Sequence, residues 1–264
     1  MLDVSVIVPA RNAEPILEEC LASIRRADPR EIIVVDGCST DGTRALARRY
    51  GARVLSDGGA GLPVARELGA RAASCGRVAL VDADVVLPDG ALAALLAEFE
   101  AGGYTGLQAG LHSVGGPGYW GRALAHHHRT GRSRRWFGLV ATVFDRKTLL
   151  AHGFDRRFLS GEDIELRRRL ARQGAKLGVS ERTLVLHRFE DGFAFARRQF
   201  LADGHGLRRI WSQDRWRGLP VLLLPAAAAL RGIALSFARL QPQWVLYYGL
   251  FAVYNYAGMT RRPG

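Results

Sequence analysis

The first hundred residues alternate short runs of branched apolar side chains with stretches whose apolar positions repeat at helical spacing. Four strand–helix units in succession predict an α/β fold. In such a fold a mostly parallel central sheet is flanked by helices and binds ligands at the carboxyl ends of its strands. The predicted strands cover 3–10, 31–36, 52–56 and 77–82, and the predicted helices cover 14–27, 39–50, 63–74 and 89–100.

The pattern is less regular in the next part of the chain. A helix is clear where Ser160 stands as a possible N-cap and Gly174 as a C-terminal stop. Three adjacent histidines at 126–128 cannot all point at one ion from a helix, so we expect them in a solvated or acceptor-facing loop. The remaining predictions are a strand over 104–114, a helix and loop over 121–131, and a strand over 138–145.

The C-terminal part is the most apolar. Residues 219–238 contain one charge, Arg231, and residues 244–259 contain none. Each segment approaches the roughly 20 apolar residues that a membrane span needs. We therefore expect a catalytic domain over 1–210 and a membrane-associating helical segment over 211–264. Hydropathy leaves open whether this tail spans the membrane, lies on its surface, or packs on the soluble domain as a helical pair.

Flanking charges favour one orientation of the tail. Arginines lie outside both ends of the apolar region, and the short connection inside it carries a single one, Arg239. This asymmetry favours a hairpin with both ends on the cytoplasmic side. The flanking arginines are Arg208, Arg209, Arg215 and Arg217 before the region and Arg261 and Arg262 after it.

Composition narrows the compartment and the partners. The 264 residues are 48% hydrophobic and 23% charged, as in an ordinary folded protein, and the net charge of +12 favours an anionic partner. The three cysteines have neither metal-ligand nor disulfide spacing, and the N-terminus has no signal-peptide pattern. We therefore expect the protein to be located at the cytoplasmic face of the inner or plasma membrane. No RNA-recognition signature is present, so nucleic acid is not an expected partner.

Acidic residues at predicted strand ends are the main chemical signal. Asp82 and Asp84 lie one residue apart where the strand 77–82 ends, and in an extended strand they would face the same side. Paired carboxylates of this kind bind Mg²⁺ or Mn²⁺ and leave positions open for phosphates. Asp36 ends another strand, whereas Asp41 is expected to be a turn or cap residue. Neither a G-x-G-x-x-G nor a P-loop motif occurs, which disfavours a dehydrogenase and a P-loop NTPase.

Five motifs in order resemble the family 2 glycosyltransferases of the GT-A fold. The resemblance implies a GT-A, Rossmann-like fold and the inverting transfer of one sugar from a nucleotide-sugar, typically a UDP-sugar, to an acceptor hydroxyl. The Gln-x-x-Arg-Trp signature of processive synthases is absent, so we expect a non-processive enzyme. The motifs are SVIVPARNAE (5–14), IIVVDGCSTDGT (32–43), RELGARAASCGRVALVDADVVLP (66–88), FDRRFLSGEDIELRRRLARQGAKLGV (154–179) and LHRF (186–189).

The resemblance assigns five residues to the donor. Asp36 would bind the nucleotide base, with Pro9 and Arg11 near the nucleotide. Arg66 would lie near the base or diphosphate, and Asp82 would hold the donor sugar or ribose. The residue after Arg66 departs from the family pattern, because glutamate stands where the family often has asparagine.

The resemblance also assigns the metal and the chemistry. Asp84 would be the main ligand of a divalent cation, Mn²⁺ or Mg²⁺, with His187 as a further ligand. Asp163 would be the catalytic base, with Glu162 beside it. A structural alternative is that Ser160 and Asp163 form a capping box at a helix start.

Other functions stay open at this point. A sugar nucleotidyltransferase shares the strand order and the aspartate pair but usually opens with a glycine-rich loop, which VPARNA lacks. A non-enzymatic basic protein that binds membranes is the other alternative, given the charge of +12. Our leading expectation is a metal-dependent glycosyltransferase with a glycan or lipid-linked acceptor and a membrane surface as partner.

Overall fold

The computed structural model describes residues 1–131, 137–158, 160–213 and 219–260. The chain forms two compact units, each built from several separate stretches of the sequence. The expected division at residue 210 into a catalytic domain and a membrane-associating tail stays a prediction. Arg215, Arg217, Arg261 and Arg262 lie outside the described residues. The first unit contains 1–112, 135–157 and 163–188, and the second contains 113–134, 158–162 and 189–264.

The first unit is built on an eight-stranded mixed sheet, counted over the described residues. Its order is β3-β2-β1-β4-β7-β6-β8-β5, with β1 to β4 parallel to one another and β7 antiparallel to both β4 and β6. The predicted fold class is confirmed. The strands are β1 (Leu2–Ala10), β2 (Pro29–Asp36), β3 (Arg53–Ser56), β4 (Arg77–Val81), β5 (Val85–Val86), β6 (Gly106–Gly115), β7 (Ala141–Asp145) and β8 (Leu177–Phe189).

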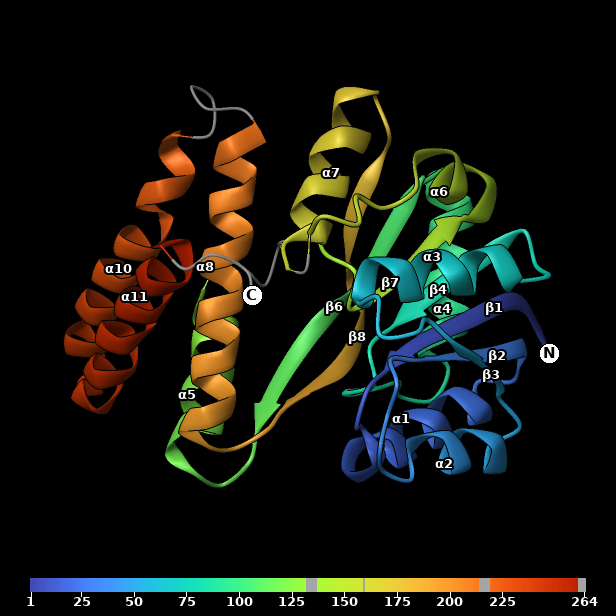
Figure 1. The fold of residues 1–264 in the computed structure, drawn as a ribbon, viewed down its shortest axis with the longest axis horizontal. Coiled ribbons are helices and arrows are strands. Elements are labelled where there is room, and N and C mark those ends of the chain that lie inside the picture. The colour runs from blue at the N-terminus through green and yellow to red at the C-terminus, as the bar shows by residue number, and fades with distance from the viewer. Residues whose placement is uncertain (132–136, 159, 214–218, 261–264) are drawn as a thin grey trace. The chain divides into compact units, whose positions relative to one another are not determined.

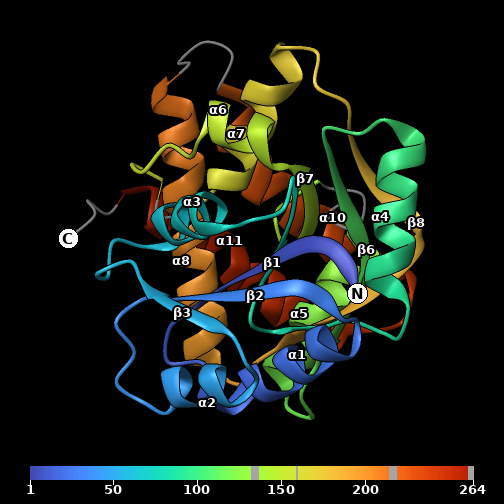
Figure 2. The same ribbon diagram turned by 90° about the vertical axis from the view of Figure 1, so that its right-hand side faces the viewer.

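Helices cover both faces of this sheet (Figures 1 and 2). Val6 and Val8 of β1 pack with the apolar faces of α1, α2 and α4, whereas Ile7 between them packs with α3, α6 and α7. Side chains alternate between the faces because the strand has a period of two. The helices are α1 (Glu14–Arg26), α2 (Thr43–Arg49), α3 (Leu62–Ala72), α4 (Ala91–Gly102), α6 (Arg146–His152) and α7 (Glu162–Arg172).

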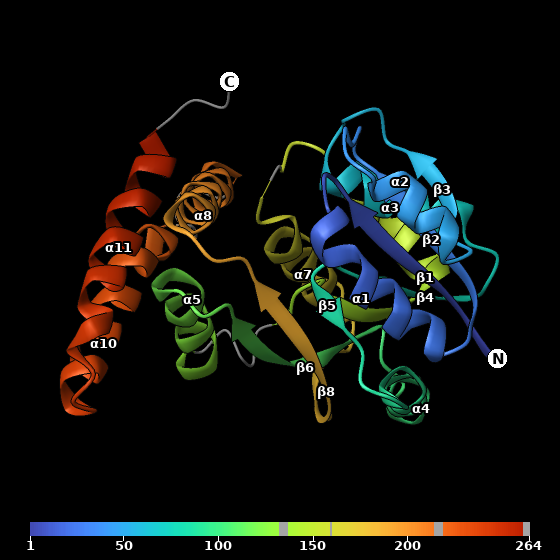
Figure 3. The same cartoon turned by 90° about the horizontal axis from the view of Figure 1, so that it is seen from below.

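The second unit is helical (Figure 3). Helix α8 packs along α11, and α11 also packs against α10. Among the described residues, one helical stretch, Pro220–Ala238, has the length and apolar composition to cross a membrane. The elements are α5 (Tyr119–Thr130), α8 (Phe193–Gln213), the 3₁₀ turn η2 (Leu219–Leu223), α10 (Leu224–Ala238), the 3₁₀ turn η3 (Pro242–Trp244) and α11 (Val245–Thr260).

Aromatic rings fill the core of the second unit. Tyr247 and Phe251 of α11 lie 5.4 Å and 5.3 Å from the ring of Phe200 on α8. His127 lies 5.2 Å from Phe251, and burial lowers its pKa from 6.5 to about 4. The expectation of a loop at 126–128 was therefore wrong. These histidines belong to α5, and the half-buried His127 packs among the aromatic rings of α11.

Candidate active site

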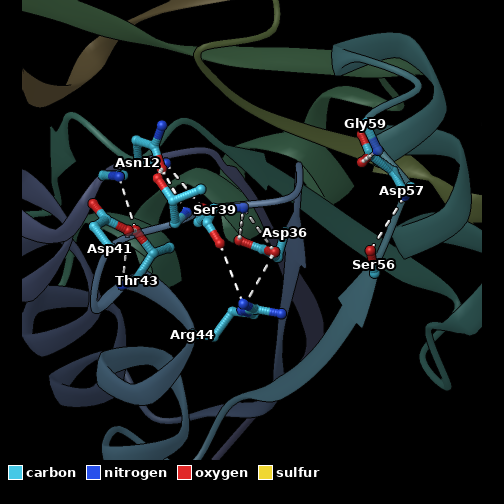
Figure 4. Close-up of polar contacts among 12 residues, drawn as sticks. Asn12, Asp36, Ser39, Asp41, Thr43, Arg44, Ser56, Asp57 and Gly59 are labelled. Carbon is cyan, nitrogen blue, oxygen red and sulfur yellow. Dashed lines mark hydrogen bonds and ion pairs between the residues drawn. The ribbon is translucent and has the colours of Figure 1, made fainter.

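The loops after β1 and β2 are hydrogen bonded to each other (Figure 4). The amide N–H of Thr40 donates to Asn12 Oδ1 at 2.9 Å, and the N–H of Asn12 donates to Ser39 Oγ at 2.9 Å. Asn12 has a φ of 49°, in the left-handed region that asparagine enters more readily than most residues. These contacts hold the two loops in one fixed arrangement at the carboxyl edge of the parallel strands.

The helices that follow these loops cap each other. Glu14 at the start of α1 accepts the N–H of Gly42 at 2.8 Å, and Asp41 accepts the N–H of Glu14 at 3.2 Å. Thr43 Oγ1 accepts the N–H of Ala13 at 2.8 Å. Asp41 also accepts the N–H and hydroxyl of Thr43, and these bonds lower its pKa. Asp41 is therefore a turn and cap residue, as expected.

Asp36 ends β2 and is almost fully buried, with 1% of its surface exposed. Its two carboxylate oxygens accept the N–H of Ser39 at 3.3 Å and 3.2 Å, and Arg44 Nε lies 3.8 Å from Oδ2. The fixed carboxylate is suited to receive hydrogen bonds from a ligand at this edge. Of the other predicted donor residues, Pro9 is buried one residue before the end of β1, and Arg11 is exposed in the loop that follows.

Asp57 is a candidate site residue that the sequence reasoning missed. It follows β3, and its N–H donates to the carbonyl of Asp36 at 3.1 Å. Its carboxylate accepts the N–H of Gly59 at 2.8 Å and of Gly61 at 3.1 Å, and both glycines have positive φ. The residue therefore shapes a glycine-rich loop beside Asp36 (Figure 4). Its position at the end of the third parallel strand was the available signal.

Asp82 and Asp84 lie in a turn rather than in the strand. β4 ends at Val81, and the N–H of Val85 donates to the carbonyl of Asp82 at 3.1 Å, which closes the turn. The explanation from strand geometry was thus wrong, although both carboxylates lie at the predicted edge of the sheet. Arg66 of α3, whose side chain is 2% exposed, donates to Asp82 Oδ1 at 2.8 Å. Burial raises the pKa of Asp82, and this effect exceeds the opposing effect of Arg66.

Asp84 pairs with His187, and these are the two residues that the family resemblance assigns to a metal. β5 runs antiparallel to β8 with Val85 opposite His187, and this pairing brings His187 Nε2 to 3.3 Å from Asp84 Oδ2. Burial alone would lower the pKa of His187, but the hydrogen bond with Asp84 and the charges of Asp84 and Asp82 raise it overall. The other oxygen, Asp84 Oδ1, is buried and has no hydrogen-bond partner in the described part of the chain.

The side chains around Asp84 fit a cation that takes some of its ligands from the protein and the others from a bound substrate. Within the described residues, no group of three His, Cys, Asp or Glu side chains is arranged to hold a metal ion by itself. Asp84 and His187 offer an oxygen and a nitrogen, and the unsatisfied Oδ1 has an acceptor site to spare. Mg²⁺ and related ions are commonly held by one or two protein groups together with substrate phosphates.

Asp163 lies near the start of α7. The helix begins at Glu162, and Asp163 Oδ1 accepts the N–H of Ile164 at 2.8 Å, so the capping box with Ser160 stays a prediction. A Cβ added at Gly138 would approach Asp163 Oδ2 to 3.2 Å, so the carboxylate lies against the segment that leads into β7. The same segment contacts the aspartate turn, because the carbonyl of Val140 accepts the N–H of Asp82 at 2.9 Å.

Glu162, assigned to the catalytic region, and Glu67, which departs from the family pattern, are both buried. Glu162 is 6% exposed and belongs to the second compact unit. Glu67, at the position where the sequence departs from the family pattern, lies 2.8 Å from Arg71 and 3.6 Å from Arg156. Its carboxylate is therefore engaged by two cations of its own unit.

Comparisons with known proteins agree on one family. The family described as Glycosyl transferase family 2 matches residues 5–203. An uncharacterized glycosyltransferase of Mycobacterium tuberculosis is 38% identical over 114 residues, which are 41% of this chain and 51% of that protein. The match thus spans about half the length of this curated relative.

Solved glycosyltransferases of the GT-A fold have the same architecture. The mannosyltransferase PcManGT from Pyrobaculum calidifontis, in complex with GDP-Man and Mn²⁺, superposes with a TM-score of 0.68 at 20% identity, covering 97% of this chain and 86% of that one. Residues 1–349 of TarS from S. aureus, in complex with UDP-GlcNAc, superpose with a TM-score of 0.60 at 19% identity, covering 98% and 88%. At these identities the likeness establishes the fold.

Proposed function

Because this chain belongs to glycosyl transferase family 2, we propose that it transfers one sugar from a nucleotide-sugar to an acceptor hydroxyl with inversion, assisted by a divalent cation. The observation that carries the proposal is the aspartate turn. Asp82 is paired with the buried Arg66, and Asp84 is paired with His187, beside the loops that hold Asp36. This edge of the sheet combines base recognition with neutralisation of a diphosphate.

The donor binds along the carboxyl edge of the parallel strands. Asp36 receives the hydrogen bond of the base, with Pro9 and Arg11 at the same edge. Arg66 faces the diphosphate or base while it holds Asp82, which contacts the ribose or the sugar. The GDP-Man and UDP-GlcNAc complexes of the two structural neighbours support a nucleoside diphosphate in this fold. UDP is the nucleotide that we test first.

Asp84 and His187 hold the cation, Mn²⁺ or Mg²⁺, together with the donor phosphates. The ion supplies positive charge where negative charge develops on the leaving diphosphate. Arg66 contributes fixed positive charge to the same region, since its guanidinium is buried and held by Asp82. The Mn²⁺ in the mannosyltransferase complex supports this use of the site.

Asp163 is the general base in this proposal. It takes the proton of the acceptor hydroxyl as that oxygen attacks the anomeric carbon, and the bond to the diphosphate breaks in the same step. A single displacement inverts the anomeric configuration. Glu162, next to it at the start of α7, is the second acidic residue that we assign to the catalytic region.

The acceptor is a lipid-linked or envelope glycan, and the enzyme works at the cytoplasmic face of the membrane. The catalytic domain spans 1–210 and the helical segment 211–264 brings it to the membrane. The helical stretch Pro220–Ala238 has the length and apolar composition of a membrane helix, which supports this placement.

The proposal is tested by release of nucleoside diphosphate from UDP- and GDP-sugars, with membrane lipid extract as acceptor and Mn²⁺ present. Wild-type protein is expected to release diphosphate in an acceptor-dependent manner, and Asp163→Asn is expected to reduce the rate at least a hundredfold while it still binds the donor. Asp89→Asn is the matched control, because Asp89 lies on the surface in an exposed pair with Arg26. Equal rates for Asp163→Asn and the control would exclude Asp163 as the base.

A further inference from the structure

Helix α10 has large apolar side chains outside and mainly small or polar side chains inside. On α10 the buried stripe is Pro225, Ala229, Gly232 and Ser236. A helix of a water-soluble protein shows the opposite arrangement, because burial of large apolar side chains stabilises it. The outward positions of α10 and the residues next to it include Leu223, Leu224, Leu230, Phe237 and Leu240, which are between 48% and 89% exposed.

Helix α11 also exposes large apolar side chains. Its exposed stripe runs through Leu246, Val253 and Tyr256. Its inner side buries aromatic rings together with the polar Asn255, and the hydroxyl of the buried Tyr247 has no hydrogen-bond partner in the described part of the chain. Eight of the eleven large hydrophobic residues that are exposed in the described chain lie between 223 and 256. They form a surface that we call the apolar face: Leu223, Leu224, Leu230, Phe237, Leu240, Leu246, Val253 and Tyr256.

Charge identifies what this face meets. The second unit contains 14 arginines and 5 acidic residues, so it carries nine of the twelve net positive charges of the chain, whereas the first unit is close to balanced. Arg231 of α10 and Arg239, the C-cap residue that follows it, are exposed. An apolar face with Arg231 and Arg239 exposed on the same helical segment, in a unit of net positive charge, complements a bilayer that contains anionic lipids.

The packing of the helices excludes a hairpin that crosses the bilayer. One side of α11 is occupied by α8, which carries Arg197, Arg198, Asp203 and Arg208, and Arg208 donates to the carbonyl of Met259 at 2.9 Å. A spanning α11 would carry these charges into hydrocarbon, where each is costly. With 16 residues, α11 is about 24 Å long, against about 30 Å for the hydrocarbon core.

Arg231 gives an independent argument about α10. It lies in the middle of the helix, and its guanidinium donates to the carbonyl of Thr130 at the end of α5, at 3.2 Å. The charge is thereby tied to the protein beside the helix, while Leu230 and Phe237 point outward. A helix that lies flat keeps this charge at headgroup level and puts the two apolar side chains below it.

We propose that α10 and α11 lie in the plane of the membrane as an interfacial pair, with the apolar face immersed in the outer part of an anionic leaflet and α8 on the water side. This arrangement rests on the proposed membrane association and decides between the spanning and surface forms. It also places the acceptor's lipid end at the surface on which the second unit rests.

Vesicle binding tests the face. Cosedimentation with vesicles of phosphatidylglycerol and phosphatidylcholine is expected to be strong for wild-type protein, weaker in high salt, and at least tenfold weaker for Leu230→Ser/Phe237→Ser. Leu184→Ser is the matched control, since Leu184 is 47% exposed on β8 of the first unit. Binding unaffected by the double substitution would overturn the proposal. The proposal would also be overturned if the wild-type protein formed a stable dimer in lipid-free solution and the double variant lost this dimer while it still bound vesicles as wild type does.

Depth measurements test the orientation. Single nitroxide labels at Ala227, Ala228, Ala234 and Leu235, in a Cys38→Ser variant whose remaining cysteines are buried, report how deep each position lies. An in-plane helix predicts deep labels at Ala227 and Ala234 and shallow labels at their neighbours. A gradual rise of depth along the helix, the same on both faces, would show a span instead and overturn the proposal.

Nucleotide binding by the same samples separates the two proposals. If vesicle binding or depth fails while Mn²⁺-dependent nucleotide binding persists, the in-plane arrangement is wrong and the catalytic proposal stands. If nucleotide binding fails while the vesicle and depth results are as predicted, the catalytic proposal is wrong and the in-plane arrangement stands.

Discussion

Acid should destabilise the second unit through His127. This side chain lies in the aromatic core, and burial lowers its pKa from 6.5 to about 4, with the nearby charges of His126 and Arg231 acting in the same direction. In the unfolded chain it takes up a proton near pH 6.5, whereas in the folded protein it stays neutral to about pH 4. The unfolded state therefore binds more protons in this interval, and stability falls as the pH is lowered through it.

The magnitude follows from the difference between the two pKa values. The full loss is about 3 kcal/mol, and about 2 kcal/mol of it is expected between pH 7 and pH 5. In a unit of this size that corresponds to a decrease of several degrees in the midpoint of thermal unfolding. The effect of His127 is measured as the difference between wild type and a variant that cannot take up the proton.

The assay is thermal unfolding in mild detergent, followed by near-ultraviolet circular dichroism at pH 7, 6 and 5. His127→Phe keeps an aromatic ring among Tyr247, Tyr248 and Phe251 and is expected to lose less stability on acidification than wild type. His112→Phe, at an exposed position of the first unit, is the control and should follow wild type. If His127→Phe and wild type lose the same stability between pH 7 and pH 5, His127 is not buried as a neutral ring.

Three further predictions concern single contacts. Arg66→Ala removes the partner of Asp82 and should lower the free energy of unfolding of the first unit by up to about 3 kcal/mol, measured by denaturant titration. It should also weaken nucleotide binding, measured by calorimetry, whereas the control Arg71→Ala should leave nucleotide binding unchanged. Asp57→Ala frees the N–H groups of Gly59 and Gly61 and should weaken nucleotide binding about tenfold by calorimetry; unchanged affinity would remove this loop from the donor site. Gly204→Ala places a Cβ 2.0 Å from the carbonyl oxygen of Asn255 and should destabilise the second unit by about 1–3 kcal/mol. Gly249→Ala, on the open side of α11, should not destabilise it. Equal thermal unfolding midpoints for the two variants would contradict the close packing of α8 on α11.

Local patterns explain why the strand–helix units were predicted well. β1 and β2 are runs of branched apolar residues, and α1 has apolar residues at helical spacing, so each element is marked by its own sequence. The predicted ends differ from the observed ones by a few residues, because helix and strand ends depend on neighbours that a local pattern does not contain.

The details of the site depend on contacts between distant parts of the chain. β5 has two residues and exists because it pairs with β8 about a hundred positions later, and this pairing also brings His187 to Asp84. The turn at 82–84 and the role of Asp57 were missed for the same reason. The inversion of α10 was also beyond prediction, because composition shows that a segment is apolar but not which of its sides the protein covers.

The most direct test of the catalytic proposal is calorimetric titration of UDP and GDP into the full chain, with and without Mn²⁺. Wild-type protein is expected to bind one nucleotide at least tenfold more tightly with Mn²⁺, Asp84→Asn to lose this dependence, and Asp89→Asn to keep it. Nucleotide binding that is independent of the metal, or a metal dependence that survives in Asp84→Asn, would contradict the assignment of Asp84 and His187 as the cation site.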